Sequence, residues 1–175
     1  RRQRQMCIRD RTYTASDSSG NTSSITRTVN VVDTTDPIIV LEGDNPITIE
    51  VGTAFTDPGA TATDNSGDQV DVIVSGTVDV NTVGTYTLTY TATDSSGNTS
   101  SITRIVNVVD TTNPTLLLTG SDLITIEVGT AFTDPGATAT DNYDEDVTVT
   151  TTGTVDINTV GTYTLTYTAT DSSGN

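Results

Sequence analysis

The clearest pattern in the chain is a strict alternation of apolar and polar residues in 85–93, which reads T-Y-T-L-T-Y-T-A-T. Every second residue of this segment is apolar, so the apolar side chains share one face of an extended strand. Residues 47–51 alternate in the same way. We therefore expect strands that turn one face to a core and the other to water.

Further short β-branched runs lie between clusters of Gly, Asn, Asp and Pro, and threonine alone supplies 41 of the 175 residues. This is the composition of strands separated by turns. In the last of these runs, we expect Ile102, Val106 and Val108 to point inward. About seven strands are predicted in one stretch of 77 residues: 38–41, 47–51, 60–63, 70–74, 77–80, 85–93 and 101–109. This density of strands favours an all-β, two-sheet antiparallel sandwich.

The strand pattern recurs at a spacing of 77 residues. Of the 63 positions in 36–98, 46 recur identically in 113–175, and residues 12–37 match 89–114 at 23 of 26 positions. A period this long indicates separate modules in tandem. The predicted divisions are the C-terminal hairpin of a truncated repeat in 12–35, a complete repeat in 36–112, and a repeat lacking its last strand in 113–175.

The N-terminal residues 1–11 do not match the repeat. They begin R-R-Q-R-Q-M-C-I-R-D, which resembles the translation of a transposase adapter used in sequencing libraries. We interpret this segment as non-native and adapter-derived, at the start of an assembled metagenomic reading frame that is truncated at both ends. A genuine basic N-terminal arm is the alternative.

Charge narrows the possible partners. The formal net charge is -16, and from Thr12 onward only Arg27 and Arg104 oppose 22 carboxylates. Such a surface repels phosphate backbones and anionic headgroups, so we expect no nucleic-acid partner. No apolar run of about 18 residues is present, and we expect no membrane insertion. An acidic surface attracts divalent cations instead.

Three strings of the complete repeat carry a family resemblance. They are I-T-I-E-V-G-T-A-F-T-D-P-G-A-T-A-T-D-N (47–65), G-T-Y-T-L-T-Y-T-A-T-D-S-S-G-N (84–98) and T-R-I-V-N-V-V-D-T-T-N-P (103–114). They resemble the bacterial Ig-like repeat found in a pesticidal crystal protein and in many secreted surface proteins, which is similar in style to hyalin repeats. The resemblance covers 12–175. It implies tandem Ig-like sandwiches in a protein that is secreted or attached to the cell surface, with no catalytic residues.

Aspartates gather in the linkers and loops where the repeats meet. The loops at one pole of an Ig-type sandwich lie close together, so we expect each linker to face loop aspartates. Ca²⁺ takes six to eight oxygen ligands, which repeated carboxylates and amides near a short linker can supply. The candidate Ca²⁺ ligands are Asp33, Asp36, Asp57 and Asp94 at the first junction and Asp64, Asp68, Asp110, Asn113, Asp134 and Asp171 at the second.

The same aspartates have a second interpretation. Asp before Pro or Gly accepts hydrogen bonds from nearby backbone amides, so Asp57, Asp64 and Asp94 can form turns without any metal. The metal interpretation also predicts where two of these aspartates lie. It places Asp64 and Asp68 at the C-terminal pole of the complete repeat, facing the last repeat. The sequence leaves both interpretations open.

The predicted function is not catalytic. The chain has no histidine or lysine that could act as a base for its many hydroxyls. We expect an extracellular spacer or stalk of a bacterial surface adhesin, whose partners are neighbouring repeats of the same chain and a surface glycan or protein. The alternative is an accessory carbohydrate- or protein-binding module of a secreted enzyme.

The ends of the repeats predict self-association. The last repeat contains no counterpart of 99–110, so one of its sheet edges should be open, whereas 22–32 carries the corresponding strand without a sheet. An open edge invites the addition of a strand from another chain. We therefore expect head-to-tail association or aggregation of this chain.

Overall fold

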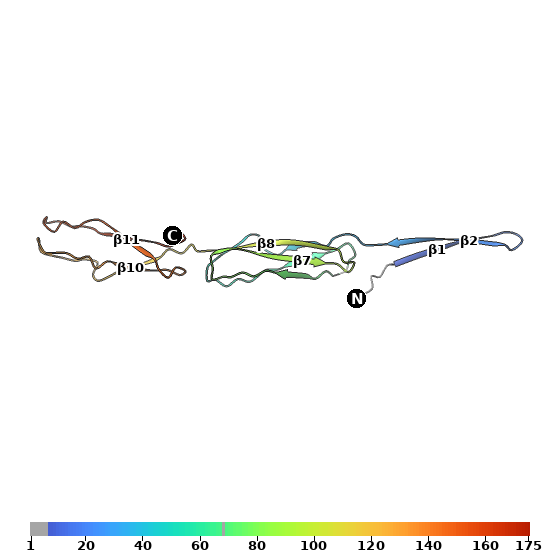
Figure 1. Cartoon of the computed structure of the whole chain (residues 1–175), viewed down its shortest axis with the longest axis horizontal. Helices are drawn as coiled ribbons and strands as arrows, with labels where there is room; N and C mark the ends of the chain where they lie inside the picture. The colour runs from blue at the N-terminus through green and yellow to red at the C-terminus, as the bar shows by residue number, and fades with distance from the viewer. Residues whose placement is uncertain (1–6, 68) are drawn as a thin grey trace. The chain divides into compact units, whose positions relative to one another are not determined.

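All regular elements of the computed structural model are β-strands within the described residues, 7–67 and 69–175 (Figure 1). This confirms the predicted all-β class. No helix in these ranges is long and apolar enough to cross a bilayer. The strands are β1 (Cys7–Ser16), β2 (Thr22–Val31), β3 (Ile38–Leu41), β4 (Ile47–Glu50), β5 (Ala60–Thr63), β6 (Val72–Ser75), β7 (Gly84–Thr93), β8 (Thr99–Val109), β9 (Thr115–Leu118), β10 (Ala137–Thr140), β11 (Thr148–Thr152) and β12 (Thr166–Thr170).

The chain divides into two compact units, and the complete repeat contributes to both. The first unit also contains the N-terminal hairpin, and the second also contains the last repeat. The first comprises residues up to 45 together with 57–77 and 87–104, and the second comprises 46–56, 78–86 and 105–175.

In the first unit, β1 and β2 form a two-stranded antiparallel sheet whose register runs from Cys7 opposite Val31 to Ser16 opposite Thr22. The sheet begins inside the segment 1–11 that the sequence marks as non-native, and residues 1–6 lie outside the described part of the chain. Strand pairing uses backbone groups, so a sequence that departs from the repeat can still occupy β1.

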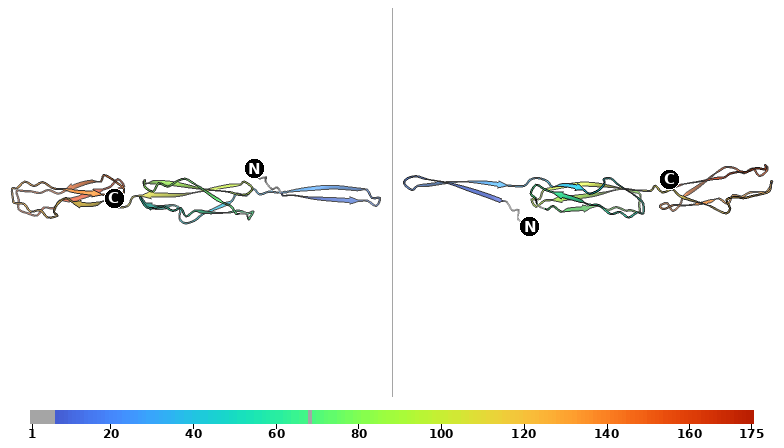
Figure 2. Two further views of the ribbon diagram at one scale, coloured as in Figure 1. Left: turned by 90° about the horizontal axis from the view of Figure 1, so that it is seen from below. Right: turned by 180° about the vertical axis from the view of Figure 1, so that it is seen from behind.

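The first unit also contains two further pairs of strands, which belong to different sheets (Figure 2). In one sheet β3 pairs antiparallel with β5, and in the other β6 pairs antiparallel with β7. The alternation in β7 has the predicted phase, because Tyr90 and Ala92 are fully buried and Thr93 is exposed. Burial of these apolar side chains supplies the main stabilisation of the sandwich.

In the second unit, β4 pairs parallel with β8, with Ile47 opposite Val106 and Glu50 opposite Val109. The larger sheet has the order β4-β8-β7-β6. This parallel pair departs from the wholly antiparallel arrangement that we predicted. It arises because the chain changes sheets between β3, which pairs with β5, and β4, which pairs with β8.

The last repeat in the second unit contains two separate pairs, β9 with β10 and β11 with β12. Its residues 124–127 have the same sequence as β4, I-T-I-E, but they form no strand. Its counterpart of the ten-residue β7 is β12, which has only five residues. In the complete sheet β8 lies between β4 and β7, and no described strand takes that place in the last repeat.

Two expectations for the complete repeat are wrong. Residues 77–80 form no strand, because Gly76 has a positive φ of 103° that ends β6, and Val80 then accepts a backbone hydrogen bond from Gly52. Ile102 is 38% exposed rather than buried. In that half of β8 the strand β4 does not pair, so Ile102 lies at an open sheet edge.

Candidate metal centres

The loop D-S-S-G-N after β7 holds Asp94 in a fixed position. Its Oδ1 accepts hydrogen bonds from the backbone amides of Gly97 (2.6 Å) and Asn98 (2.8 Å), and its Oδ2 accepts one from the side chain of Asn98 (2.7 Å). The last repeat builds the same loop around Asp171, with bonds from Asn175 of 2.7 and 2.9 Å. This is the turn chemistry that the sequence offered as the second interpretation.

Turn formation alone does not account for the way in which three carboxylates gather at the first junction. Asp33, Asp64 and Asp94 each offer an oxygen, and these oxygens lie within 4.8 Å of one another. We call these three residues the first cluster. Asp33 comes from the linker, where its Oδ1 accepts the amide of Thr35 (3.1 Å), and its backbone oxygen accepts Asn98 (3.4 Å).

A second cluster joins the next linker to the last repeat. Its members are Asp110, Asp141, Asp144 and Asp171, whose oxygens also lie within 4.8 Å of one another. Asp144 accepts the amide and the hydroxyl of Ser172 at 2.6 and 2.8 Å, which fixes its carboxylate toward Asp171. The linker is anchored here as well, because the backbone oxygen of Asp110 accepts the side chain of Asn175 (3.1 Å).

Several carboxylate oxygens in the two clusters are buried without a hydrogen-bond donor. Within the described residues these are Asp64 Oδ1, Asp110 Oδ2 and Asp141 Oδ1. Asp110 exposes only 7% of its surface. A buried anionic oxygen without a partner is costly, and a bound cation is one of the few arrangements that satisfies it. The geometry therefore fits an ion with oxygen ligands.

The carboxylates are ionised at neutral pH where shifts are resolved. Burial raises the pKa of Asp94, but hydrogen bonds from Asn98 and Gly97 outweigh it and leave the pKa below its usual value. Burial likewise raises the pKa of Asp171, but hydrogen bonds, mainly from Asn175, outweigh it and leave that pKa below its usual value. The amide and hydroxyl of Ser66 lower the pKa of Asp64, while the nearby charge of Asp94 acts in the opposite direction. Like charges held this close repel each other unless a cation lies between them.

The structure groups only part of the predicted ligand set. Asp33, Asp94, Asp110 and Asp171 lie in the clusters, as does Asp64, but Asp64 joins the first junction and not the second. Its expected place at the C-terminal pole is therefore corrected. Because β5 runs antiparallel to β3, it returns the chain to the end at which β3 begins, where Asp64 meets Asp33 and Asp94.

Asp141 and Asp144 were missed by the sequence reasoning. Asp141 could have been found, because it lies 77 residues after Asp64 in an identical string. Asp144 has no such signal, since Gly67 takes its place in the complete repeat. Asp36 and Asn113 are exposed and belong to neither cluster, and Asp68 lies outside the described residues.

Asp57 and Asp134 lie apart from both clusters, in a hydrogen-bond network inside their own repeats. Asp57 accepts the hydroxyl of Tyr90 (2.6 Å) and the amide of Gly59 (3.1 Å), and it lies 3.5 Å from Nε of Arg104. Asp134 accepts the hydroxyl of Tyr167 at 2.6 Å. These aspartates brace the sandwich, and the structure does not bring them to a junction.

Arg104 completes the brace in the complete repeat and is fully buried. Its guanidinium donates to the backbone oxygens of Asp44 (2.6 Å), Glu42 (2.5 Å) and Gly59 (2.9 Å). It therefore ties β8 to the segments that follow β3 and precede β5. The sequence did not indicate this role, because a charged residue within an alternating strand is normally assigned to solvent.

Glu50 is a further residue that the sequence did not single out. Its carboxylate accepts the hydroxyls of Thr111 and Thr112, each at 2.7 Å, and the amide of Thr111 at 3.0 Å. The hydrogen bonds from Thr111, followed by those from Thr112 and Asn142, lower the pKa of Glu50 to about 2. Glu50 thus holds the linker to the end of the repeat that precedes it.

Comparison with known proteins supports the repeat assignment. The model of the family described as bacterial surface protein, Ig-like domain matches residues 39–108 and 116–175. Hyalin of Strongylocentrotus purpuratus is 43% identical over 148 residues, which cover 73% of this chain and 12% of the hyalin. Hyalin of Lytechinus variegatus is 40% identical over 128 residues, which cover 68% of this chain and 24% of the hyalin. The chain thus spans less than a quarter of the length of these relatives.

Among solved structures, a lipoprotein of Bacteroides thetaiotaomicron is similar to 65% of this chain and is covered over 55% of its own length. The two are 33% identical in sequence, with a TM-score of 0.39.

Proposed function

Because the chain belongs to the family of bacterial surface protein Ig-like domains, we propose that it is a non-catalytic, extracellular segment of a bacterial surface adhesin. Its tandem repeats act as a spacer or stalk, and Ca²⁺ bound at the junctions stiffens them. The similarity to hyalins concerns a short part of each relative, so it supports a repeated module and assigns no activity of the whole protein.

The observation that carries the proposal is the recurrence of one arrangement at two junctions. In each case an aspartate of the linker, Asp33 or Asp110, meets aspartates from two loops of the following repeat. In each case an asparagine of the D-S-S-G-N loop also binds a linker backbone oxygen. A cation shared by these groups would tie the linker to the repeat and restrict the angle between modules.

The second cluster has the better donor set for Ca²⁺. Four carboxylates offer oxygens within 4.8 Å, and Asp110 contributes a buried Oδ2 without a hydrogen-bond donor. Ca²⁺ takes six to eight oxygens, so carboxylates that bind with one or two oxygens leave a few positions for water or backbone oxygens. The first cluster has three carboxylates, because Gly67 replaces Asp144 there. We therefore expect the second junction to bind Ca²⁺ more tightly.

Two features support the non-catalytic part of the proposal. The chain has no histidine or lysine to activate a hydroxyl. Outside the clusters, the buried side chains of Tyr90 and Arg104 and the half-buried Asp57 bind one another and backbone oxygens inside the sandwich. Side chains that satisfy each other in this way brace the fold and do not face a substrate.

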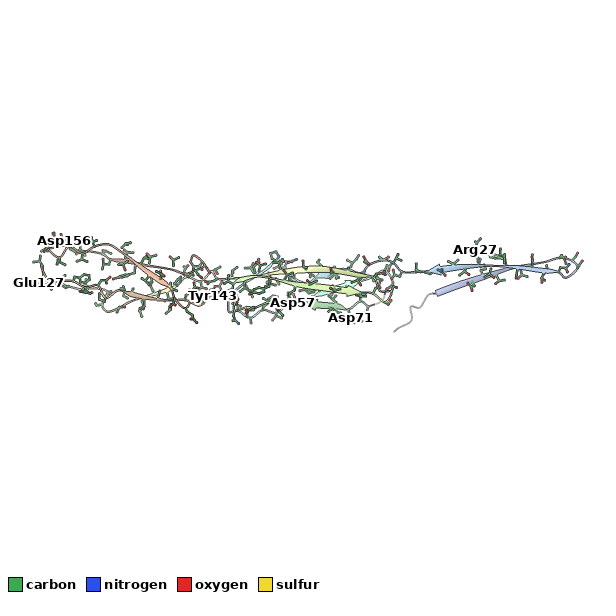
Figure 3. All side chains as sticks on the ribbon, in the orientation of Figure 1. Arg27, Asp57, Asp71, Glu127, Tyr143 and Asp156 are labelled. Atoms are coloured by element: carbon green, nitrogen blue, oxygen red, sulfur yellow. The ribbon has the colours of Figure 1, made fainter. Side chains whose placement is uncertain are left out.

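The test is Tb³⁺ luminescence, since Tb³⁺ occupies Ca²⁺ sites and is excited through a nearby tyrosine. Tyr143 lies in the loop between Asp141 and Asp144 (labelled in Figure 3), and Ser66 takes its place in the complete repeat. We expect a Tyr-sensitised signal that Ca²⁺ displaces. The Tyr143→Phe variant should lose most of the signal but retain Ca²⁺ binding.

Thermal unfolding provides the second readout. A ligand that binds only the folded state at a thousandfold excess over its Kd stabilises that state by about 4 kcal/mol. We therefore expect a higher Tm in millimolar Ca²⁺ than in EDTA. A Tm that does not change, together with no displaceable Tb³⁺ signal, would leave the aspartates as turn residues and remove the calcium part of the proposal.

A further inference from the structure

A recess of about 440 Å³ lies beside the second cluster, within the second compact unit. Its walls come from the end of the complete repeat, from the linker and from two loops of the last repeat. The volume is in the range of about 300–1,000 Å³ that is typical of small-ligand sites. The recess is lined by Val83, Val109, Asp110, Tyr143, Ser172 and Ser173.

Asp110 belongs both to the second cluster and to the wall of the recess. It is 7% exposed, and its Oδ2 accepts no hydrogen bond from the described residues. At the first junction the counterpart Asp33 accepts the hydroxyl of Ser96 through Oδ2 at 3.4 Å. Among the described residues the second junction lacks this bond, so Asp110 Oδ2 remains open to a ligand at the recess.

The loop 171–175, which carries Ser172 and Ser173, is held by its own residues. Its hydrogen bonds are those of 94–98, the loop of identical sequence that leads into β8 in the complete repeat. The position of the two serines therefore follows from the local sequence D-S-S-G-N.

Tyr143 gives the recess an aromatic wall (labelled in Figure 3). It is half-buried, and its backbone amide donates to Asp141 (2.9 Å), but its hydroxyl has no partner among the described residues. The other four tyrosines of the two repeats donate their hydroxyls within their own repeats: Tyr86, Tyr90, Tyr163 and Tyr167. A fixed ring with an unused hydroxyl suits a ligand that has both apolar and polar faces.

The loop that carries Tyr143 differs between the repeats, whereas the sequence before it does not. Residues 47–65 are identical to 124–142, but 66–69 and 143–146 differ at all four positions. The change places Tyr143 and Asp144 at the second junction. Binding residues are typically carried by variable loops on a constant scaffold, so this pattern indicates a site specific to the second junction.

We propose that the recess binds a neutral saccharide, two vicinal hydroxyls of which coordinate the Ca²⁺ of the second cluster. Because this Ca²⁺ is that of the proposed function, the saccharide site rests on that proposal. Ca²⁺ takes six to eight oxygens, so the four carboxylates leave positions that two hydroxyls can fill on the side of Asp110. Val83, Val109 and the ring of Tyr143 then pack against C–H groups of the sugar. Its other hydroxyls bond to those of Tyr143 and Ser173.

Charge selects the class of ligand. The four carboxylates carry two more charges than one Ca²⁺ neutralises, and no cationic side chain lines the recess among the described residues. An anionic ligand, such as a phosphate or a sulfated sugar, is therefore repelled. A cationic side chain of a partner protein would compete with Ca²⁺ for the carboxylates. Neutral hydroxyls meet no such repulsion and require the ion.

An NMR titration of the chain with methyl α-mannoside, methyl β-galactoside and methyl α-fucoside tests the proposal. In millimolar Ca²⁺ at least one glycoside should shift the backbone amides of Tyr143 and Ser173, and in EDTA none should. Tyr-sensitised Tb³⁺ luminescence of the same sample reports the ion. Displaceable Tb³⁺ without any glycoside shift would overturn the saccharide site alone. Absence of Tb³⁺ binding would overturn the Ca²⁺ site and the saccharide site together, and equal shifts in EDTA would exclude coordination by the ion.

Substitutions in the wall locate the sugar. Tyr143→Ala keeps the backbone amide that donates to Asp141 and all four clustered carboxylates, so calorimetry should show unchanged Ca²⁺ binding. Its glycoside affinity should fall by about tenfold, because the aromatic contact is lost. Val83→Asn should also weaken glycoside binding. Val160→Asn, the same change at the corresponding position of the last repeat, lies outside the recess and should not. Glycoside affinity that is unchanged in Tyr143→Ala and in Val83→Asn would exclude this recess as the site.

Discussion

Arg104 donates a 2.9 Å hydrogen bond from Nε to the hydroxyl oxygen of Tyr90, and both side chains are fully buried. The tyrosine hydroxyl in turn donates to Asp57. Burial, followed by the hydrogen bond to Asp57, raises the pKa of Tyr90, so the phenol stays protonated and continues to donate. The interior of this small sandwich thus contains an ordered charge network beside its apolar core.

Arg104→Ala should unfold the complete repeat or destabilise it by about 3–5 kcal/mol, because it removes the cation beside Asp57 and leaves three backbone oxygens without their donor. Arg27→Ala is the matched control, since Arg27 occupies the same position in β2 but is exposed. At concentrations where the chain is monomeric, it should change the free energy of unfolding by less than about 0.5 kcal/mol. Urea denaturation measures both. If Arg104→Ala lowered the free energy of unfolding by as little as Arg27→Ala, the network would add nothing to stability.

The strands were predictable where alternation fixes the inward face. The bounds of β3 and β5 agree with the prediction, and the buried face of β7 is the predicted one. Arg104 was not predictable in the same way. It lies in phase with Val106 and Val108, but its charge argues for solvent, and only the three-dimensional arrangement of backbone oxygens shows that burial is tolerated.

The candidate site was only partly predictable, because the end of the sandwich at which a loop lies depends on the strand topology. The linker aspartates and the D-S-S-G-N loops follow from the repeat, and Asp33 and Asp94 do come together. The pole of Asp64 depends on the direction of each strand. That direction could not be read from the sequence, since nothing there shows that β3 and β4 belong to different sheets.

Asp144→Ala should weaken Ca²⁺ binding at the second junction by tenfold or more, which corresponds to about 1.4 kcal/mol, because it removes one of four clustered carboxylates. Asp146→Ala removes the same charge from an exposed position in the same loop, outside the cluster. Isothermal titration calorimetry measures both affinities. If the two variants weaken binding equally, the effect is one of general charge, and Asp144 is not a ligand.

The hydrogen bonds between Glu50 and the linker residues Thr111 and Thr112 should be sensitive to acid. Its folded-state pKa of about 2 lies below the model-compound value of 4.5. The stabilisation by ionised Glu50 is therefore present above pH 4.5 and is lost as the pH falls toward 2. The amide of Thr111, which donates to Glu50 over 3.0 Å, should shift in NMR spectra of the folded chain with a midpoint near pH 2.

Glu50→Gln should remove this acid transition of Thr111, because the amide side chain does not titrate. Glu127→Gln is the matched control, since Glu127 occupies the corresponding position in the last repeat and is exposed. It should leave the transition in place. A transition that persists in Glu50→Gln would assign the titration to another carboxylate.

An appended copy of β8 should extend the strand pairing of the last repeat. We expect that a copy of residues 99–110 appended after Asn175 pairs with residues 124–127, as β8 pairs with β4. The backbone amides of Ile126 and Leu165 should then become protected in hydrogen exchange. A scrambled appendix of the same composition should not protect them. Equal protection by both appendices would mean that the appended segment does not pair in the register of β8.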